Sequence, residues 1–559
     1  MDRRIVLAIG LMLIVAILPS ILFPPKQRVS GGDLILTDSV PISAPDTSAQ
    51  LGGAGEPAPP PREPVVEAVV PDTTSAVAAE DSVVVESPIY RYVFSTKGAR
   101  LISATIKGYR SFAPNDTGLV QLMPQDAQFL QHSLVFGNDT LSLADWIFQP
   151  SRSTLQVEQA GASLEWVARR GAAEIRLRQT FLLDEYSYDL SGEFSGFGAE
   201  AGLVLLSMGP RHRLVEADST WDFRSYAIVT RARSAERTSF GSLDPGERVE
   251  LAGPFEWVAV KSRYFLTAVL TAGDGEPRIG GVVATGGQRD GKYAKRAYAV
   301  ASLPAPGGRF SYAVYIGPQE FRRLAHIGHG LEDVNPYGWV LRPIIQPIAN
   351  IIARILVWMH QTLSLGYGWV LILFGIAVRI VLWPLNQKAM RSSMAMQAVQ
   401  PEIKAIQERY KQDPQQLQKE MMKLYKEHGV NPLGGCLPML LPMPVLFALF
   451  FVFRETIEFR GVPWLWLPDL SRADPLYIIP VVMGLSMFVV SKLGQRGVPP
   501  NPQTKMMLYF MPGMLTVLFL KFSAGLNLYY AVSNIASIPQ QWMISQERLR
   551  RVGKAAAKK

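Results

Sequence analysis

Apolar residues in this chain gather in long runs, one close to the start and the others in the last third. A helix that crosses a membrane needs about 20 mainly apolar residues. Runs of nearly this length predict six membrane spans, at 5–23, 367–385, 436–453, 475–493, 506–522 and 526–544. We therefore expect a membrane protein built on an α-helical bundle.

A different pattern fills residues 89–318. Short stretches in which polar and apolar residues alternate, such as 174–178 and 186–190, are separated by Gly, Pro, Asp and Asn. Alternation with period two places one face of a strand in a core and the other in solvent. This region therefore predicts an all-β sandwich domain.

The stretch before this domain, residues 24–88, is rich in Pro, Ala, Ser, Val and acidic residues. It sustains no helical or strand periodicity, and its composition is typical of a disordered tether. The first apolar run follows Arg3 and Arg4 and exceeds the core of about 7–15 residues found in cleavable signal peptides. No A-x-A cleavage pattern follows it, so residues 1–23 are expected to remain as an N-terminal membrane anchor.

Helical periodicity returns within 319–365, after a stop at Gly317-Pro318. Apolar residues recur there every three or four positions: Ile344, Ile348, Ile352, Ile355 and Met359. This spacing predicts a connector followed by an amphipathic helix. The apolar face of that helix either lies in the membrane interface or packs on the β domain.

Between the second span (366–386) and the last four (431–545), residues 387–430 predict a cytoplasmic helical hairpin divided at Asp413-Pro414. This segment carries eight Lys and Arg residues, and the tail 546–559 is also basic. Short basic loops remain in the cytoplasm, so both termini are expected there and the β domain on the far side. The Met-rich helices of the hairpin either contact varied apolar segments or present a plain solvated face.

Composition narrows the function. Only 18% of the 559 residues are charged, against about 25% in soluble proteins. Basic residues collect beside the apolar runs without a nucleic-acid-binding signature, which favours membrane lipids over a specific nucleic-acid sequence as partner. Cys436 is the only cysteine, so the chain forms no internal disulfide and no Cys-based metal cluster, and we expect a small buried apolar side chain there.

Catalytic and nucleotide-binding patterns are missing. Residues 286–293 nearly match a phosphate-binding loop, but Tyr293 stands where that loop needs Ser or Thr. A hairpin turn on Asp290-Gly291 is the preferred interpretation. The spans contain no metalloprotease motif, catalytic triad or convergent carboxylate pair. We expect a protein that is not an enzyme, with no metal and no cofactor.

One charged residue, Arg379, interrupts an apolar run. It lies six residues before Leu385, the cytoplasmic end of the span, or roughly 9 Å at 1.5 Å per residue. Placing Arg at the centre of a span costs about 2.5–3.5 kcal/mol, and less at this shallower depth. Either the guanidinium snorkels to the headgroups, or it faces a wet cavity inside the bundle.

The last span carries a polar stripe. Five polar or amphipathic residues have the spacing of a single helix face: Asn527, Tyr530, Asn534, Ser537 and Gln541. These side chains are costly against lipid. They therefore either hydrogen-bond to neighbouring helices or share a groove with Arg379.

Six motifs carry a resemblance to a known family. They are Val378-Arg-Ile-Val-Leu-Trp-Pro-Leu385, Asn431-Pro-Leu-Gly-Gly-Cys-Leu-Pro438, Trp466-Leu-Pro-Asp-Leu-Ser-Arg-Ala-Asp-Pro475, Gly525-Leu-Asn-Leu-Tyr-Tyr-Ala-Val-Ser-Asn534, Trp257-Val-Ala-Val-Lys-Ser-Arg-Tyr-Phe265 and Tyr315-Ile-Gly-Pro318. In this order they resemble the YidC/Oxa/Alb family of membrane-protein insertases, in its bacterial form with a large periplasmic domain. The resemblance covers the chain except residues 24–88.

The resemblance implies an insertase and chaperone of the bacterial inner membrane that works without nucleotide hydrolysis. A five-helix core would enclose a hydrophilic groove lined by Arg379, Asn527, Tyr530, Asn534, Ser537 and Gln541. Client helices would leave along spans that contain Met443, Phe447, Met507 and Phe510. The β domain would be a periplasmic supersandwich similar to sugar-binding folds. Partners would be nascent membrane-protein clients, the Sec translocon, and the ribosome through the cytoplasmic loops and basic tail.

Four positions depart from the usual pattern of the family. This chain has Gly375 where the family often has Thr, and Pro442-Met443-Pro444 where it often has Gln-Met-Pro. It has Ser523-Ala524-Gly525-Leu526 where the family often has Pro-Ser-Gly-Leu, and Asn527 where the family usually has an apolar residue. The family's residue roles therefore carry over best to Arg379, Tyr530 and Asn534. Two other functions fit a polar bundle, a small-solute transporter and a receptor with a sensing β domain, although no internal repeat of the transporter kind is visible.

Overall fold

The computed structural model describes residues 80–158, 161–197, 202–272, 279–290, 293–338, 341–429, 443–496 and 506–556. The expected anchor at 1–23, most of the expected tether and Cys436 lie outside these residues. The chain divides into Met1–Asp81 and a compact unit, Ser82–Lys559. The following description concerns this second unit.

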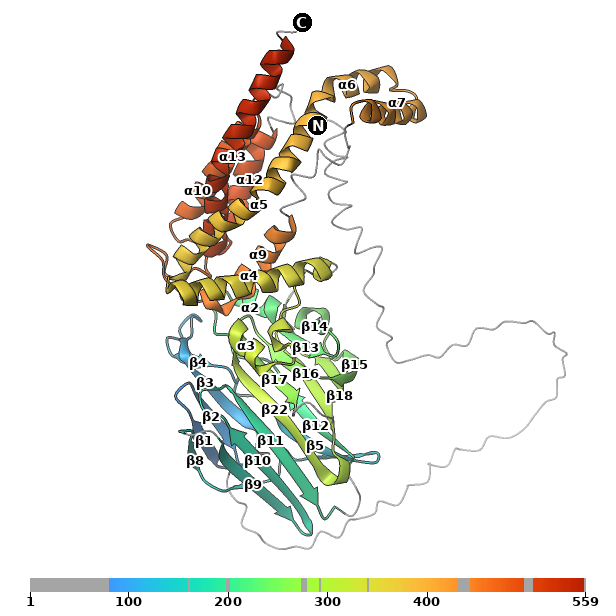
Figure 1. The fold of residues 1–559 in the computed structure, drawn as a ribbon. Coiled ribbons are helices and arrows are strands. Elements are labelled where there is room, and N and C mark those ends of the chain that lie inside the picture. The colour runs from blue at the N-terminus through green and yellow to red at the C-terminus, as the bar shows by residue number, and fades with distance from the viewer. Residues whose placement is uncertain are drawn as a thin grey trace, which may run out of the picture. The chain divides into compact units, whose positions relative to one another are not determined.

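The first half of the unit is a β domain with three main sheets (Figure 1). One sheet has the order β4 (Leu119–Gln121), β3 (Leu101–Arg110), β2 (Tyr90–Ser95), β1 (Ser82–Glu86) and β8 (Thr154–Gln156). The largest has the order β14 (Ala235–Ser239), β13 (Ala227–Arg231), β16 (Trp257–Lys261), β17 (Phe265–Thr271), β22 (Arg309–Pro318), β11 (Ser187–Ser195), β10 (Ala173–Phe181), β9 (Ala162–Arg170) and β7 (Gln149–Pro150). The third has the order β15 (Arg248–Phe255), β18 (Ile279–Gly286), β21 (Ala297–Pro304), β12 (Leu203–Met208), β5 (Gln131–Phe136) and β6 (Asp139–Ser142).

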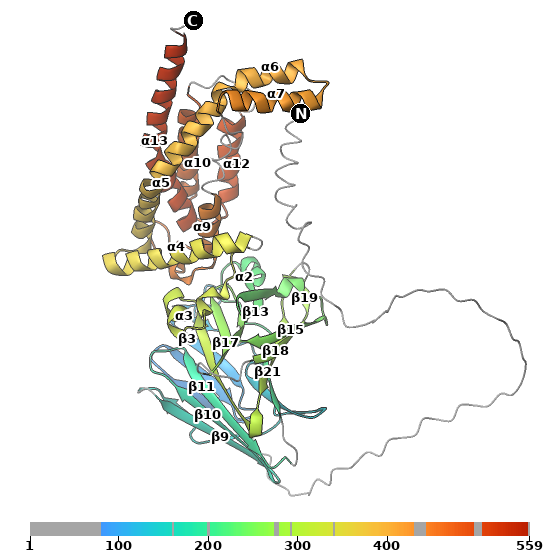
Figure 2. The ribbon, with the colours of Figure 1, turned by 45° about the vertical axis from the view of Figure 1, so that its right-hand side comes forward.

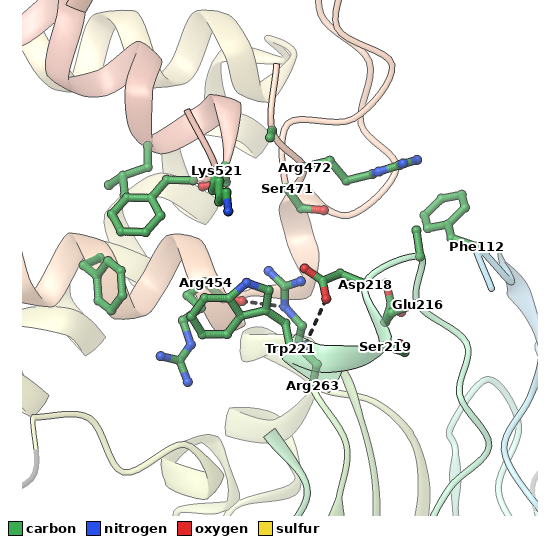
Figure 3. Close-up of a pocket in the computed structure, with 16 residues that line it drawn as sticks. Phe112, Glu216, Asp218, Ser219, Trp221, Arg263, Arg454, Ser471, Arg472 and Lys521 are labelled. Atoms are coloured by element: carbon green, nitrogen blue, oxygen red, sulfur yellow. Dashed lines mark hydrogen bonds between the residues drawn. The ribbon is translucent and has the colours of Figure 1, made fainter. Parts of the chain in front are cut away.

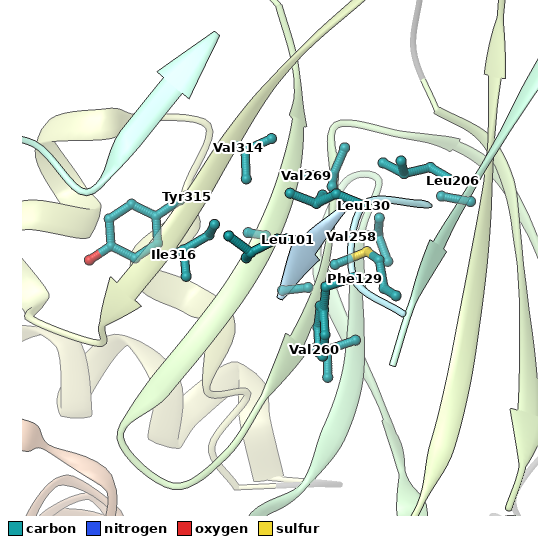
Figure 4. Close-up of a cluster of buried hydrophobic side chains, with 14 of the residues drawn as sticks. Leu101, Phe129, Leu130, Leu206, Val258, Val260, Val269, Val314, Tyr315 and Ile316 are labelled. Carbon is teal, nitrogen blue, oxygen red and sulfur yellow. The ribbon is translucent and has the colours of Figure 1, made fainter. Parts of the chain in front are cut away.

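Alternating side chains build the core between these sheets. Strand β11 buries every second residue and pairs antiparallel with β10 and β22. Figure 4 shows where the three sheets meet, at fully buried Leu101, Val269 and Leu206. The β-rich domain expected from the two-residue periodicity is thus present.

The β domain begins earlier than its composition suggested. Strand β1 starts at Ser82, inside the segment 24–88 that was expected to be a tether, and its Val83 and Val85 side chains are buried. The acidic residues around this short strand hide its alternation. Farther along, β19 (Arg289–Asp290) and β20 (Tyr293–Ala294) pair antiparallel, as expected for a hairpin rather than a phosphate loop.

The second half of the unit is helical (Figure 2). Its helices are α4 (Arg342–Leu363), α5 (Tyr367–Ala398), α6 (Gln400–Arg409), α7 (Pro414–Glu427), α9 (Met443–Glu455), α10 (Ile478–Gly494), α12 (Met511–Phe519) and α13 (Ala524–Ala556), with a π-helical turn η7 (Met506–Phe510) before α12. Shorter helices lie within the β domain and in the segments that precede or connect the longer helices. They are α2 (Ser219–Ser225), α3 (Phe321–Ile327), η1 (Phe240–Ser242), η2 (Pro306–Gly308), η3 (Leu331–Val334) and η6 (Ile457–Phe459).

Length and apolar composition allow two of the described helices to cross a membrane, Arg342–Leu363 and Tyr367–Ser392. Two shorter apolar helices, Ile478–Gly494 and Leu508–Phe519, follow in the bundle. A helical C-terminal region is therefore present, whereas the number of six spans stays a prediction.

Helix α4 buries only part of the predicted apolar face. Ile345, Ala349 and Leu356 are buried, and α4 packs against α9. Ile344 and Trp358 are 54% and 59% exposed. Ile352 and Met359 belong to the buried face as expected, but Ile344 and Ile355 do not, because both sides of this helix are apolar and only packing distinguishes them.

The predicted helical hairpin divides where the sequence indicates. The Asp413 carboxylate accepts hydrogen bonds from the backbone N–H groups of Gln415 and Gln416, at 3.1 and 3.0 Å, and so caps α7. The first predicted helix of the hairpin is broken, however. Residues up to Ala398 continue α5, and α6 restarts with Pro401 in its first turn.

Buried ion pairs join the β domain to the end of α9 and to the segment that follows it. Arg460 Nε lies 2.7 Å from Glu216 Oε1, with side chains 1% and 7% exposed. Lys261 Nζ lies 3.6 Å from Glu455 Oε2, and both side chains are buried. Removing one partner of a buried pair leaves an uncompensated charge. This joint therefore holds the end of α9 against the β domain.

Glu458 in this joint predicts a pH-dependent stability. Its Oε1 accepts the Phe321 N–H at 2.8 Å, and burial raises its pKa to about 7. Folded Glu458 keeps a proton that the unfolded chain releases at lower pH, so the free energy of unfolding falls as pH rises from about 4.5 to about 7. Glu458→Gln keeps a side-chain oxygen that can accept the hydrogen bond of the Phe321 N–H, but it cannot titrate. It therefore removes this fall in the free energy of unfolding, which is on the order of 2–3 kcal/mol.

Thermal unfolding in detergent at pH 5 and pH 8 measures this effect. We expect the free energy of unfolding of Glu458→Gln, relative to that of wild type, to be higher at pH 8 than at pH 5. Glu250→Gln, at an exposed position of β15, is the matched control. A difference between wild type and Glu458→Gln that does not change with pH contradicts the prediction.

Candidate functional site

A cavity of about 290 Å³ lies inside the helical region, where α5, α9, α10, α12 and α13 meet. Its lining is mostly apolar, with polar groups contributed by α5 and α13. The lining residues are Val378, Arg379, Leu382, Asn386, Val445, Leu446, Leu449, Met483, Met487, Leu515, Phe519, Tyr529, Tyr530, Ser533 and Asn534.

Arg379 is held at the cavity by the facing helix. Its Nε lies 2.9 Å from both the backbone oxygen and the hydroxyl oxygen of Ser533 on α13. Arg379 forms no ion pair with another residue that the structure describes. A cation in apolar surroundings attracts an anion more strongly than it does in water. The cavity therefore presents a positive charge whose fixed partners are neutral oxygens.

Gly375 permits this close approach of the two helices. A Cβ at this position would lie 3.3 Å from Val532 Cγ1, which is tighter than an ordinary contact. The position sits one turn before Arg379, on the side of α5 that faces α13. A larger residue here would require the Val532 side chain to give way by a few tenths of an ångström. The glycine noted in the sequence as a departure is thus part of the geometry of the cavity.

The polar stripe of α13 is divided between two environments. Tyr530 and Asn534 line the cavity, and Asn534 Nδ2 donates to Ser486 Oγ on α10 at 3.3 Å. Ser537 and Gln541 lie outside the lining. Ser537 Oγ donates to its own helix, at 2.6 Å from the Asn534 carbonyl oxygen.

Asn527 also lies outside the cavity. It is fully buried, and its Nδ2 donates to the carbonyl oxygens of Phe519 and Phe522, at 3.0 and 3.4 Å. These two carbonyls belong to the end of α12 and the turn that follows it. Asn527 therefore fixes the connection between α12 and α13.

Ser533 and Gln540 were not among the site residues predicted from the sequence. Ser533 accepts from Arg379, and Gln540 Nε2 donates to the Trp383 carbonyl oxygen on α5 at 2.9 Å. A second stripe with helical spacing, through Tyr530, Ser533 and Gln540, runs one position beside the predicted one. This stripe was a usable signal, and it is the face that α13 turns toward α5.

The four expected client-contact residues have separate positions. Phe447 is partly buried and packs against the apolar core of the helical region. Phe510 is 58% exposed. The side chains of Met443 and Met507 lie outside what the structure describes. Across the described residues, no group of three or more His, Cys, Asp or Glu side chains is placed to hold a metal ion.

Two family models match the chain over adjoining regions. The model described as YidC periplasmic domain matches residues 82–359, and the model described as 60Kd inner membrane protein matches residues 358–551. The first begins at the residue where β1 begins. Together the two models span the whole unit from the first strand almost to the end of α13.

Relatives extend this similarity to nearly the full length. A protein of Ralstonia nicotianae named membrane protein insertase YidC is 31% identical over 94% of this chain and 95% of its own. Proteins of the same name from Chlorobaculum tepidum and Cupriavidus necator are 30% and 36% identical, over 84% and 68% of this chain and 82% and 68% of their own. A crystal structure of an active YidC insertase overlaps 83% of this chain and 93% of its own with 18% identity and a TM-score of 0.33.

The position of Asn527 predicts a structural role. Asn527→Ala removes both hydrogen bonds to the turn after α12, and we expect it to lower the free energy of unfolding by about 1–3 kcal/mol. Asn534→Ala, whose single bond is 3.3 Å long, should lower it less. Thermal unfolding of both variants in detergent shows which of them is the less stable. An Asn534 variant less stable than the Asn527 variant contradicts this assignment.

Proposed function

The chain belongs to the YidC family of membrane protein insertases, and from this premise we propose that the cavity around Arg379 is its client groove. As a member of this family it inserts proteins into the bacterial inner membrane and is not an enzyme. In the proposed groove, Arg379, Tyr530 and Asn534 meet the polar part of a client. Ser533 joins them because it holds the guanidinium in place.

The charge arrangement supports this role. A client tail that must cross the membrane carries polar and acidic groups, whose burial in lipid without partners costs several kcal/mol each. Arg379 offers a carboxylate an opposite charge that is not already neutralised within the described chain. Asn534 and Tyr530 add neutral hydrogen-bonding groups beside it. The groove would therefore shorten the unfavourable part of the client's path.

Lipid burial of the client supplies the driving force in this proposal. Each Å² of apolar client surface that leaves water contributes about 25 cal/mol, so a single apolar helix provides ample free energy. The sequence contains no nucleotide-binding motif that would couple hydrolysis to insertion. We propose that client helices leave along the spans containing Met443 and Phe447 and those containing Met507 and Phe510.

The proposed topology has six spans, both termini in the cytoplasm and the β domain in the periplasm. The basic hairpin α6–α7 supports a cytoplasmic position for that end of α5. The exposed apolar residues of α4, among them Ile344, Ile351 and Trp358, support a place for α4 in the membrane interface. Its opposite face packs against α9 of the helical region.

Two partners beyond the client and the lipids are proposed. The basic hairpin and tail carry charge of the sign that suits the RNA surface of a ribosome. Cooperation with the Sec translocon is proposed on the family alone.

The first prediction from this function concerns the charge of Arg379. In proteoliposomes, Arg379→Ala should reduce insertion of acidic-tailed clients by about tenfold, the effect of losing roughly 1.4 kcal/mol of attraction. Arg379→Lys should retain part of the activity, since it keeps the charge but loses the guanidinium geometry. Arg354→Ala, at an exposed position on α4, is the control. Unchanged insertion of acidic-tailed clients by Arg379→Ala contradicts the proposal.

The second prediction concerns topology. In a Cys436→Ser background, Ser234→Cys in the β domain and Gln415→Cys in α7 each place one exposed cysteine. A membrane-impermeant maleimide applied to spheroplasts should label the first and should label the second only after permeabilisation. The reverse pattern, or equal labelling of both, rules out the proposed orientation.

A further inference from the structure

A second cavity, of about 470 Å³, lies where the helical region meets the β domain (Figure 3). Lys521 and Arg472 reach it from the helical side, and Trp221 and Arg263 from the β domain. Its walls thus combine basic and aromatic side chains. None of these residues takes part in the proposed client groove.

The charges around this cavity leave an excess of positive charge. Of the four basic residues in its lining, Arg454 pairs with Glu455 at 3.4 Å. Of the two acidic ones, Glu216 pairs with Arg460 at 2.7 Å.

The remaining lining charges are Arg263, Arg472 and Lys521 against the exposed carboxylate of Asp218. Neither Lys521 nor Arg472 forms an ion pair with another described residue. Arg263 Nε donates to the Arg454 carbonyl oxygen at 2.9 Å, which orients the guanidinium without neutralising it. Such a site favours a carboxylate or a phosphate as ligand.

Aromatic rings in contact with one another separate this cavity from the groove. Phe519 and Tyr530 line the groove, while Phe450 and Phe522 line the second cavity. Ring centroids of Phe519 and Phe522 are 4.9 Å apart, those of Phe450 and Phe522 are 5.6 Å apart, and those of Phe519 and Tyr530 are 5.4 Å apart. The two cavities therefore lie on opposite sides of a wall two aromatic side chains thick, with Phe519 on the groove side and Phe522 on the other.

The wall is made of side chains in apolar contact, and the backbone that carries two of them is held by hydrogen bonds. Asn527 holds the carbonyl groups of Phe519 and Phe522. Rotation of the rings would thus open the wall without unwinding α12 or α13. Opening it exchanges aromatic contacts for contacts with a client chain and breaks no ion pair of the joint.

We propose that the second cavity receives acidic residues of client segments as they leave the groove toward the β domain. This inference rests on the proposed client groove. A carboxylate that leaves Arg379 would exchange one guanidinium for the cations Lys521, Arg472 and Arg263 on the far side of the aromatic wall. The apolar parts of the segment would contact Trp221 and Phe450. The direct contact of the wall residues with the groove favours a peptide over a lipid headgroup as the occupant.

Photo-crosslinking in full-length protein in proteoliposomes tests this inference. A benzophenone side chain is introduced at Val378, which lines the groove, or at Ser523, which lines the second cavity. One client carries an acidic translocated tail and its twin carries the amide counterparts. We expect both positions to crosslink the acidic client, and Ser523 to crosslink the amide twin about threefold to tenfold less.

A charge-reversal pair gives an independent measurement. Lys521→Glu combined with Arg472→Glu should reduce insertion of the acidic client by a similar factor and leave the amide twin unchanged. Arg309→Glu, at an exposed site in β22, is the control for charge reversal.

The outcomes separate the two proposals. Crosslinks from Val378 but none from Ser523 overturn the second site and leave the groove intact. Crosslinks from neither position overturn the groove as well. Crosslinks from Ser523 to lipid alone assign the cavity to a headgroup and overturn the inference. Equal loss of both clients in the charge-reversal variant shows a structural role and also overturns it.

Discussion

The arrangement of the helical region depends on one unusual interaction, a guanidinium held between two helices by neutral oxygens. Arg379 on α5 donates to the backbone and hydroxyl oxygens of Ser533 on α13 and meets no carboxylate among the described residues. A carboxylate partner would neutralise the charge within the protein. Neutral acceptors instead fix its position and leave its charge available to a client in the proposed groove. Gly375 lies one turn away at the contact of the two helices, where a Cβ would come within 3.3 Å of Val532 Cγ1.

The β domain is connected to the same cavity through its contacts with α9. The ion pairs Lys261–Glu455 and Arg460–Glu216 hold the end of α9 and the segment after it, and α9 supplies part of the cavity wall. These pairs are buried, so their contribution lies less in net stability than in fixing one position for the helix. The cationic cavity beside them follows from the same joint. Its excess positive charge remains because the nearby carboxylates are already occupied.

Much of this organisation was predictable from the sequence because the signals were strong and local. A two-residue alternation identified the β domain, and a charge within an apolar run identified Arg379. Asp413 before Pro414 identified the start of α7, since a carboxylate cap followed by proline suits a helix N-terminus. The start of the β domain was placed too late, because β1 is short and its two buried valines stand among acidic residues.

The sequence by itself therefore determined which regions are β-rich and which are helical, and that a cation lies within an apolar helix. Tertiary structure alone decided which faces meet. On α4 both sides are apolar, so periodicity allowed two faces and packing against α9 selected one. On α13 two polar stripes run one position apart, and the rotation of the helix toward α5 selected Ser533 and removed Asn527 from the cavity. Periodicity describes a helix surface, whereas partners depend on its rotation and distance from neighbours, which are set by contacts far apart in the chain.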